Sequence, residues 1–299
     1  MPVLGVLVFL LLGLMAAQSV APSLGSLPWP AGVWEQAGNL WADHLEEQRR
    51  AAEFIEMQKE RNAQILERNP DAEVRIRPYS GKETFIDQIL TSLGTVFSGF
   101  VLASLVAIPL GIVVGLNRYL YEAVNPVIQV FKPVSPLAWL PIVTLVVSAT
   151  YTVEDPMVSR AFITSMVTVS LCSLWPTLVN TIMGVNAVSQ DLRNVSQVLR
   201  LGFFTHVWRV VLPSAIPMIF TGLRLSLGIA WMVLIAAEML AQSPGLGKFV
   251  WDEFQNGSSE SLGRIMVAVI VIGLIGLVLD RGMLMLQRLL SWDRASATH

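Results

Sequence analysis

Long apolar blocks, separated by charged segments, constrain the fold of this chain more than any other feature. A helix needs roughly 20 apolar residues to cross the hydrocarbon core of a bilayer. Charged residues make up 14% of the 299 residues, whereas about a quarter is usual in soluble domains. The sequence therefore predicts an all-α polytopic membrane protein with about six spans, one N-terminal anchor and a five-helix core. The six stretches are about 3–20, 88–116, 134–151, 160–182, 212–240 and 263–286.

The first apolar stretch has two interpretations. Residues 1–21 form either an uncleaved transmembrane anchor or a signal-like segment, because Ala16, Ala17 and Ala21 suit a cleavage site. No Lys or Arg precedes the stretch, and it is long for the apolar region of a signal peptide, so the anchor is favoured. Either alternative places the chain from Pro22 onwards outside the cytoplasm.

The distribution of Lys and Arg predicts the orientation, because short cytoplasmic loops carry an excess of both. If the span that starts near Leu90 enters from outside, the basic residues gather on the inner side. We therefore expect a cytoplasmic tail at 288–299 and a cytoplasmic loop at about 186–211. The inner residues are Arg118, Lys132, Arg193, Arg200, Arg209, Arg281, Arg288 and Arg294, and the outer ones are Arg160, Lys248 and Arg264.

The charged segment 22–87 lies outside the cytoplasm in this orientation. Apolar residues recur in it at helical spacing, and Glu46 and Arg50 form an i,i+4 pair that supports a helix. We expect an amphipathic helix over about 37–68 whose apolar face lies against the spans; the alternative is a solvated tether. The residues of that apolar face are Trp41, Leu45, Ala52, Ile55 and Leu66.

The predicted cytoplasmic loop at 186–211 has the pattern of a short helix, a glycine and a second helix. Ser189 or Asp191 can cap the first helix, and Gly202 can end it and turn the chain. Pro213 then falls in the first turn of the next span, where a missing N–H is tolerated. A rigid surface element of this kind can dock on a cytosolic partner; the alternative is an ordinary re-entry loop. The apolar faces are Leu192, Val195, Val198 and Leu199 in the first helix and Phe204, Val207 and Val211 in the second.

This loop resembles the EAA loop of permease subunits of type I ABC importers. The family loop carries a Glu-Ala-Ala triplet, a Gly four residues later and a distal Leu-Pro, which residues 212–213 match. With Gly202 as the Gly, residues 196–198 occupy the triplet; counting back from Leu-Pro places residues 194–196 there instead. Both registers lack the acidic residue.

Further stretches are similar to the nitrate, nitrite, cyanate and bicarbonate branch of that family. These are residues 194–201, 219–231 and 236–239, while 133–141 looks like the wider group that includes taurine and alkanesulfonate permeases. The resemblance covers about 88–292 and leaves the predicted helix at 37–68 unexplained. It implies a type I ABC importer transmembrane fold in the core at 88–287.

The resemblance also implies a function and partners. The chain would be a non-catalytic permease subunit in the bacterial inner membrane, surrounded by lipid. Its partners would be an ABC ATPase, a second permease copy and an extracytoplasmic solute-binding protein, and its solute nitrate or a related anion, with taurine or alkanesulfonates as the alternative. The residues implied in coupling to the ATPase are Leu192, Val195, Ser196, Gln197, Val198, Leu199, Arg200, Gly202, Leu212 and Pro213.

Two charged residues fall inside the fifth predicted span, where a charge costs about 3 kcal/mol on insertion scales. Arg224 lies near mid-depth and either lines an anion pathway or pairs with a carboxylate such as Asp280. Glu238 lies nearer the outer end, about 20 Å away at 1.5 Å per residue. It belongs either to an outer gate of the pathway or to interhelical hydrogen bonding.

Other functional classes lack their signatures. The stretch 245–248 has the wrong spacing for a phosphate-binding loop, so no ATP site is expected in this chain. One cysteine and three histidines make a structural zinc site improbable, and we expect neither a cofactor nor a catalytic residue. The net charge of −2 offers no field for nucleic acid. The remaining alternatives are a stand-alone secondary transporter, which would need coupling carboxylates at mid-span, and an integral membrane enzyme.

Overall fold

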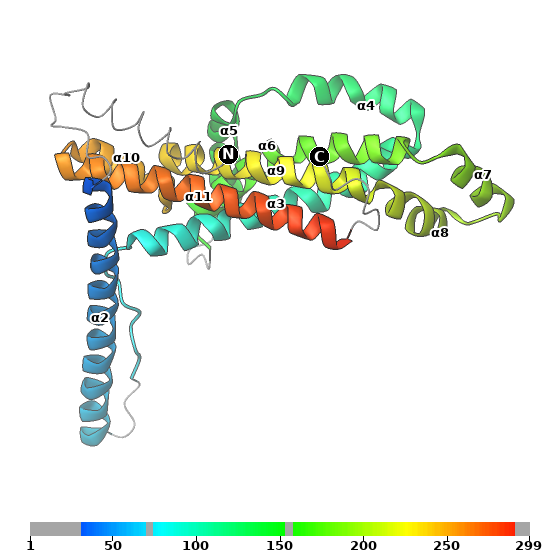
Figure 1. Ribbon diagram of the computed structural model, residues 1–299. Coiled ribbons are helices and arrows are strands. Elements are labelled where there is room, and N and C mark those ends of the chain that lie inside the picture. Colours follow the sequence, from blue (N-terminus) through cyan, green and yellow to red (C-terminus); the bar gives the residue numbers. More distant parts are fainter. Residues whose placement is uncertain (1–30, 70–73, 153–157, 291–299) are drawn as a thin grey trace, which may run out of the picture. The chain divides into compact units, whose positions relative to one another are not determined.

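The computed structural model describes residues 31–69, 74–152 and 158–290 (Figure 1). The predicted N-terminal anchor at 1–21 and most of the tail at 288–299 lie outside these ranges. Within them the regular elements are helices. The chain divides into two compact units, one of residues up to 91 together with 249–270, the other of 92–248 together with 271 onwards.

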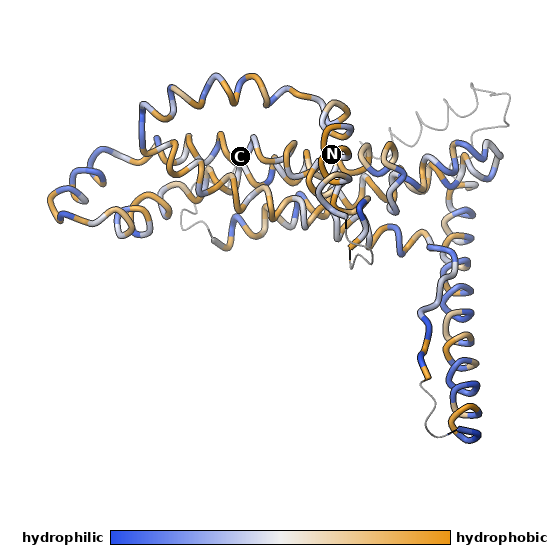
Figure 2. Tube along the Cα trace, turned by 180° about the vertical axis from the view of Figure 1, so that it is seen from behind, coloured by the Kyte–Doolittle hydropathy of each residue, from blue (hydrophilic) through white to orange (hydrophobic). Residues whose placement is uncertain are grey.

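Four helices are long and apolar enough to cross a membrane among the described residues. They are α3 (Phe85–Leu116), α6 (Arg160–Asn186), the continuous helix Phe203–Ala241 that includes α9 (Leu212–Ala241), and Glu260–Leu289 within α11 (Ser259–Leu290). These helices contain the predicted spans at 88–116, 160–182, 212–240 and 263–286. Apolar residues dominate them, whereas α2 is mostly hydrophilic (Figure 2).

The predicted span at 134–151 is not a single long helix. It corresponds to α5 (Pro136–Thr150), whose 15 residues are too short to cross a bilayer alone. The preceding helix α4 (Arg118–Phe131) and α5 are long and apolar enough to cross a membrane only when taken together, and the two helices are bent by 99° at the break between them. Pro133 and the Ser135 cap of α5 explain the break, because proline has no N–H to continue the hydrogen bonds of α4 and Ser135 accepts from the Leu137 N–H. The pair is therefore a broken span or a re-entrant segment.

Small residues let α3 approach α6 closely. They follow one another every four residues along α3 and lie on its packed face. A Cβ added at Gly111 would lie 2.6 Å from the Thr181 Cβ, and one added at Gly99 would lie 2.8 Å from the Met166 carbonyl oxygen. The two helices therefore pack closely at these positions, since only small residues permit this approach. The row comprises Gly99, Ala103, Ala107, Gly111 and Gly115.

Hydrogen bonds and close contacts join α6 to α9. The hydroxyls of Thr177 and Ser226 lie 2.7 Å apart, and Ser226 donates to the Ser173 carbonyl at 2.5 Å. A Cβ added at Gly222 would lie 2.8 Å from the Asn180 Cβ. Buried hydroxyls at span depth are thus satisfied, so α6 and α9 form a tightly packed pair.

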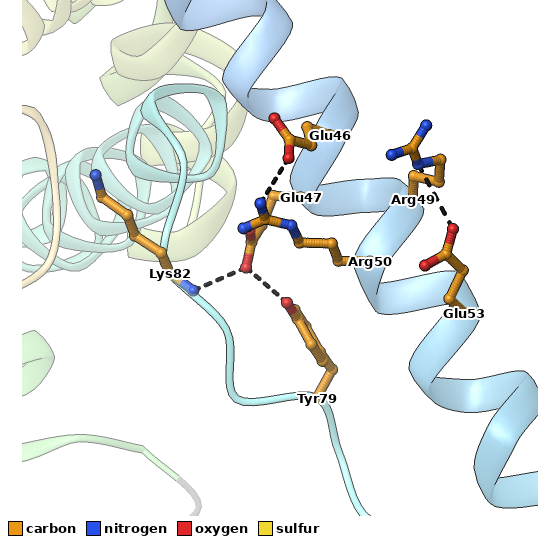
Figure 3. Close-up of polar contacts among 7 residues, drawn as sticks. All are labelled: Glu46, Glu47, Arg49, Arg50, Glu53, Tyr79 and Lys82. Atoms are coloured by element: carbon orange, nitrogen blue, oxygen red, sulfur yellow. Dashed lines mark hydrogen bonds and ion pairs between the residues drawn. The ribbon is translucent and has the colours of Figure 1, made fainter.

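In the other unit, α2 (Ala31–Arg68) occupies the region where the sequence predicts an amphipathic helix. The segment that follows runs back along α2: Gln58 binds Arg77, while the Glu47 carboxylate accepts from the Tyr79 hydroxyl at 2.8 Å and the Lys82 N–H at 2.9 Å (Figure 3). The hydrogen bond with Glu47 raises the pKa of Tyr79. These contacts hold α2 and the returning segment together as an antiparallel arm.

The residues predicted to form the apolar face of α2 are exposed within this unit, and the packing of that face against the spans stays a prediction. Trp41 is 56% exposed and Leu45 51%. The buried side chains lie on a different face and are Val33, Gln36, Leu40 and His44. The apolar periodicity of the sequence did not predict the buried face of α2, because polar residues such as Glu47 lie on that face and bond the returning segment.

His44 connects α2 to the start of α3. Thr84 and Asp87 form a capping box, in which Thr84 N–H donates to Asp87 Oδ2 at 3.1 Å and Asp87 N–H to Thr84 Oγ1 at 3.4 Å. The Thr84 hydroxyl donates its proton to Asp87 Oδ2, so it accepts from His44 Nδ1 at 2.7 Å. Gln48 Nε2 donates to the other ring nitrogen at 3.0 Å. In this network the proton between His44 and Thr84 lies on His44 Nδ1.

Candidate functional site

The segment between α6 and α9 forms a compact surface element. Ser189 caps α7 (Gln190–Val198) by accepting from the Leu192 N–H at 3.4 Å. After Leu199 the chain turns at Arg200, whose φ of 48° is left-handed. Gly202 has φ −64° and ψ 158° and caps α8 (Phe203–His206). The turn is thus made by Arg200, contrary to the prediction that Gly202 makes it.

The second helix of this segment does not end before the span. Alpha-helix α8 continues through a π-helical stretch, η1 (Val207–Val211), directly into α9. The Leu212 N–H donates to the Val207 carbonyl, five residues back. A proline has no N–H and its ring clashes with the carbonyl four residues earlier. The wider turn of η1 accommodates Pro213, so a break predicted from the sequence is replaced by a continuous helix.

Most residues predicted to couple to a partner lie exposed on this element. Val198 is 82% exposed and Phe204 78%, which are high values for apolar side chains. Trp208 is also exposed and was missed, since the sequence pattern placed only Val207 and Val211 of that turn on a face. The exposed apolar residues, which we call the α7–α8 surface, are Leu192, Val195, Val198, Leu199, Phe203, Phe204 and Trp208.

The other predicted coupling residues have different surroundings. Gln197 and Arg200 are exposed, whereas Ser196 is buried. Leu212 packs against a core cluster that contains Val211, and Pro213 is exposed. The structure thus brings the first helix of the loop to the surface and places Leu212 at the base of the span.

Two residues that the sequence analysis did not select hold α7 in place. The Arg193 guanidinium donates to the carbonyls of Val185 and Asn186, at 3.1 and 3.3 Å. His206 Nδ1 lies 2.7 Å from the Ser196 hydroxyl. No periodic signal predicts a pair ten residues apart, so sequence reasoning had no means of finding it.

Arg224 pairs with Asp280 of α11. Its Nε lies 2.5 Å from Oδ1 and its second guanidinium nitrogen 3.0 Å from Oδ2, a bidentate geometry. This is the carboxylate pairing that formed one of the two alternatives. The two side chains are nevertheless 41% and 37% exposed. A lining role stays a prediction, because the pairing and the exposure are compatible with both roles.

Glu238 is 1% exposed and lies at a corner formed by α3, α9 and the start of α10 (Leu246–Asn256). Its carboxylate accepts from the Ser92 hydroxyl at 2.8 and 2.9 Å and from the Gly247 N–H at 2.9 Å. Ser92 in turn accepts from the Leu246 N–H. Glu238 therefore makes interhelical hydrogen bonds, one of its two alternatives, while a role in the pathway stays a prediction. It is not brought together with Arg224.

Gly245 makes this arrangement possible. Its φ of 149° is a conformation that other residues rarely adopt, and a Cβ there would lie 2.3 Å from the Glu238 carboxylate. A Cβ added at Gly247 would lie 2.2 Å from the Ile235 carbonyl oxygen. These glycines let the loop fold over the carboxylate and present its N–H groups to it.

A polar cavity of about 590 Å³ lies in the unit that contains α2. Two of its basic residues are paired: Arg50 with Glu46 and Glu47, and Arg264 with Glu253 and Asp43. Within the described residues no group of three His, Cys, Asp or Glu side chains could hold a metal ion. The candidate site therefore remains the α7–α8 surface and the polar residues of the spans.

Comparison with known proteins identifies the core. Residues 107–292 match the family model described as binding-protein-dependent transport system inner membrane component. The chain is 39% identical over 202 residues to the nitrate import permease protein NrtB of Synechocystis sp., and 40% identical over 205 residues to the bicarbonate transport system permease protein CmpB of the same organism; each match covers 68% of both chains.

Solved structures show the same fold. A chain of the inward-facing methionine ABC transporter MetNI aligns with a TM-score of 0.59 at 12% identity, over 69% of this chain and 95% of that one. A chain of an amino acid ABC transporter aligns with a TM-score of 0.52 at 16% identity, over 69% of this chain and 92% of that one. The core thus has the transmembrane fold of type I ABC importers. On the extent of the family match and the identity to these relatives, the chain belongs to the family of binding-protein-dependent transport system inner membrane components.

Proposed function

We propose that this chain is the permease subunit of an ATP-driven importer, which forms the solute pathway and docks a separate ABC ATPase through the α7–α8 surface. The observation that carries the proposal is that apolar side chains are exposed on α7, 82% at Val198, and on α8, 78% at Phe204, and that α8 is continuous with a span. Exposed apolar patches of soluble domains usually mark binding surfaces. Rigid elements that move as units transmit such docking to the membrane.

The partners follow from the family. A binding protein delivers the solute from outside, and the ATPase binds inside. The chain itself hydrolyses no ATP. A second permease copy completes the pathway, and lipid surrounds the remaining apolar faces of the spans.

The proposed orientation puts the C-terminus and α7 in the cytoplasm of a bacterial cell, and α2 outside. The support is the excess of Lys and Arg in the inner segments of the sequence. This arrangement brings the α7–α8 surface to the compartment that contains ATP. It also brings the arm of α2 to the side from which a binding protein arrives.

We further propose that Arg224 faces the pathway. Ionisable side chains inside membranes face a bundle interior or a water-filled cavity and rarely lipid. The Arg224–Asp280 pair remains partly exposed, at 41% and 37%. A solvated pathway or the second copy is therefore the expected neighbour of this exposed side, and an anion passing there would compete with Asp280 for the guanidinium.

The proposed solute is nitrate or a related small oxyanion. Its support is the similarity to NrtB and CmpB, whose names specify nitrate and bicarbonate. Taurine and alkanesulfonates are the alternative, because residues 133–141 resemble the wider group. Bicarbonate is a second candidate among the small oxyanions, on the similarity to CmpB.

Uptake in a strain that lacks this gene tests the function. The strain should lose ATP-dependent uptake of labelled nitrate, and a plasmid copy should restore it. Bicarbonate and taurine are measured in parallel, so loss of either in place of nitrate would correct the solute alone. Uptake that persists after removal of the ATPase gene would contradict the importer.

A further inference from the structure

Alpha-helix α7 is too short to hold its own position. It has nine residues, and isolated helices below about 12 residues are marginal in water. Only Ser196 among its residues is buried, whereas its apolar side chains point outward. Its placement must therefore depend on a few specific contacts.

The first contact fastens α7 to α6. The Arg193 guanidinium donates to the carbonyls of Val185 and Asn186, in the last turn of α6. Those carbonyls end α6 and carry the negative end of the helix dipole, and the Val185 carbonyl also accepts from the Val188 N–H at 3.4 Å. The charge of Arg193 therefore satisfies them and holds the start of α7 against the end of α6.

The second contact fastens α7 to α8. The buried Ser196 hydroxyl lies 2.7 Å from His206 Nδ1, and the Ser196 carbonyl accepts from the Leu201 N–H at 3.1 Å. A serine hydroxyl both donates and accepts, so the contact with His206 is possible whichever ring nitrogen carries a proton. His206 is the last residue of α8 and lies on the helix that continues into α9.

Both contacts lead to the same pair of spans. Arg193 reaches α6 and His206 reaches α9, and these two helices are joined by the hydroxyls of Thr177 and Ser226 and by the close approach at Gly222. A displacement of α7 relative to α6 and α9 would therefore break at least one of the two contacts.

We propose that Arg193, Ser196 and His206 form a latch that makes α7 move as one body with α6 and α9. They are positioning residues: Ser196 and His206 act behind the docking surface, and their loss should leave its apolar side chains in place on α7. The consequence for transport rests on the function proposed above. A loosened α7 would absorb the motion of the ATPase instead of passing it to the spans.

Hydrogen exchange of the membrane-embedded permease tests the latch directly. Ser196→Ala and His206→Leu each remove the contact, and His206→Asn retains a hydrogen-bonding group where Nδ1 stands. The amides of residues 193–199 should exchange about fivefold faster in the first two variants, the factor expected from one hydrogen bond, and at the wild-type rate in His206→Asn. Unchanged exchange in both Ser196→Ala and His206→Leu would overturn the latch.

Transport by the full importer, with its ATPase and binding protein in proteoliposomes, supplies the second readout. The number of ATP molecules hydrolysed per nitrate transported should rise in Ser196→Ala and His206→Leu and return to the wild-type value in His206→Asn. Faster exchange with an unchanged ratio would overturn the positioning role. If the wild-type importer takes up no nitrate, the proposed function falls, while the exchange measurement still decides whether α7 is latched.

Discussion

At the scale of single residues, the two charged side chains within α9, Arg224 and Glu238, have partners far away in sequence. Arg224 finds Asp280, 56 positions later, and Glu238 finds Ser92, 146 positions earlier. A buried or half-buried charge that loses its partner is strongly destabilising, whereas loss of both partners often is not. Comparison of a single with a double variant therefore distinguishes a structural role of such a residue from a role in transport.

For Arg224 we expect the two roles to be separable in a double variant. Arg224→Ala leaves Asp280 without its bidentate partner, so the amount of folded permease in the membrane should fall. The variant Arg224→Ala/Asp280→Ala should recover that amount. If Arg224 attracts anions, nitrate flux per folded protein stays low in the double variant. Recovery of both quantities together would show that the pair is structural only.

A second residue-scale prediction concerns the loop over Glu238. Gly245→Ala combines a strained φ with a Cβ that lies 2.3 Å from the carboxylate, so it should destabilise the permease by about 1–3 kcal/mol. Gly228→Ala in α9 is the matched control, because no atom lies within 4 Å of its added Cβ. Thermal unfolding in detergent, followed by tryptophan fluorescence, measures both. Equal melting temperatures for the two variants would contradict the described geometry.

At the scale of elements, α7 and α8 form the surface that we propose as the docking site. Their apolar side chains are exposed on helices anchored by Arg193 and His206. An added charge should therefore leave the fold intact and affect a docked partner alone. That expectation distinguishes a docking surface from an ordinary re-entry loop.

We predict that Val198→Asp weakens binding of the ATPase at least about tenfold, as expected when a charge must be desolvated at an apolar interface. Gln190→Asp adds the same charge to α7 on a different face and serves as control. Co-purification at graded ATPase concentrations measures the loss, and the melting temperature of each free permease should equal that of the wild type. A similar loss in both variants would point to charge alone, not to the apolar face.

Sequence periodicity predicted the elements with long apolar runs and missed those shaped by tertiary contacts. The helices α3, α6, α9 and α11 follow from hydropathy, because membrane helices satisfy their backbone internally. The bent pair of α4 and α5 does not, since the apolar run at 134–151 has nearly the length of a span although its helix has only 15 residues. The packed face of α2 was likewise hidden, because hydrogen bonds from the returning segment decide it.

In the candidate site, too, periodicity predicted some residues, whereas those placed by tertiary contacts were missed. Leu192, Val195, Val198 and Leu199 were found because they recur at helical spacing, and they are exposed as a docking surface requires. The Ser196–His206 contact and the left-handed Arg200 were not found. Both depend on how the chain turns between two helices, which propensity alone does not specify.

At the scale of the whole molecule, the family match begins at residue 107 and leaves α2 outside it. The matched part carries the end of α3, the later spans and the α7–α8 surface. The arm formed by α2 and the segment that returns along it precedes the matched range. Its proposed location outside the cell, opposite to α7, makes the orientation testable.

We predict that single cysteines at Met57 of α2 and Val198 of α7 react from opposite sides of the membrane. Both side chains are exposed, and replacement of Cys172 by Ser removes the native thiol. A membrane-impermeant maleimide should label Met57→Cys in intact spheroplasts and Val198→Cys only after the membrane is opened. Labelling of Val198→Cys in intact spheroplasts would reverse the proposed topology.

The π-helical stretch at 207–211 has one more consequence. A hydrogen bond that spans five residues in place of four accommodates one extra residue within an otherwise regular helix, and one residue corresponds to a rotation of about 100°. The direction in which Phe203 and Phe204 point is therefore set independently of the face that α9 turns toward α6. A one-residue deletion within 207–211 would rotate Phe203 and Phe204 about the helix axis while the packing of α9 against α6 stayed the same. Insertion or deletion at this single turn would therefore change which partner surface the two aromatic side chains fit.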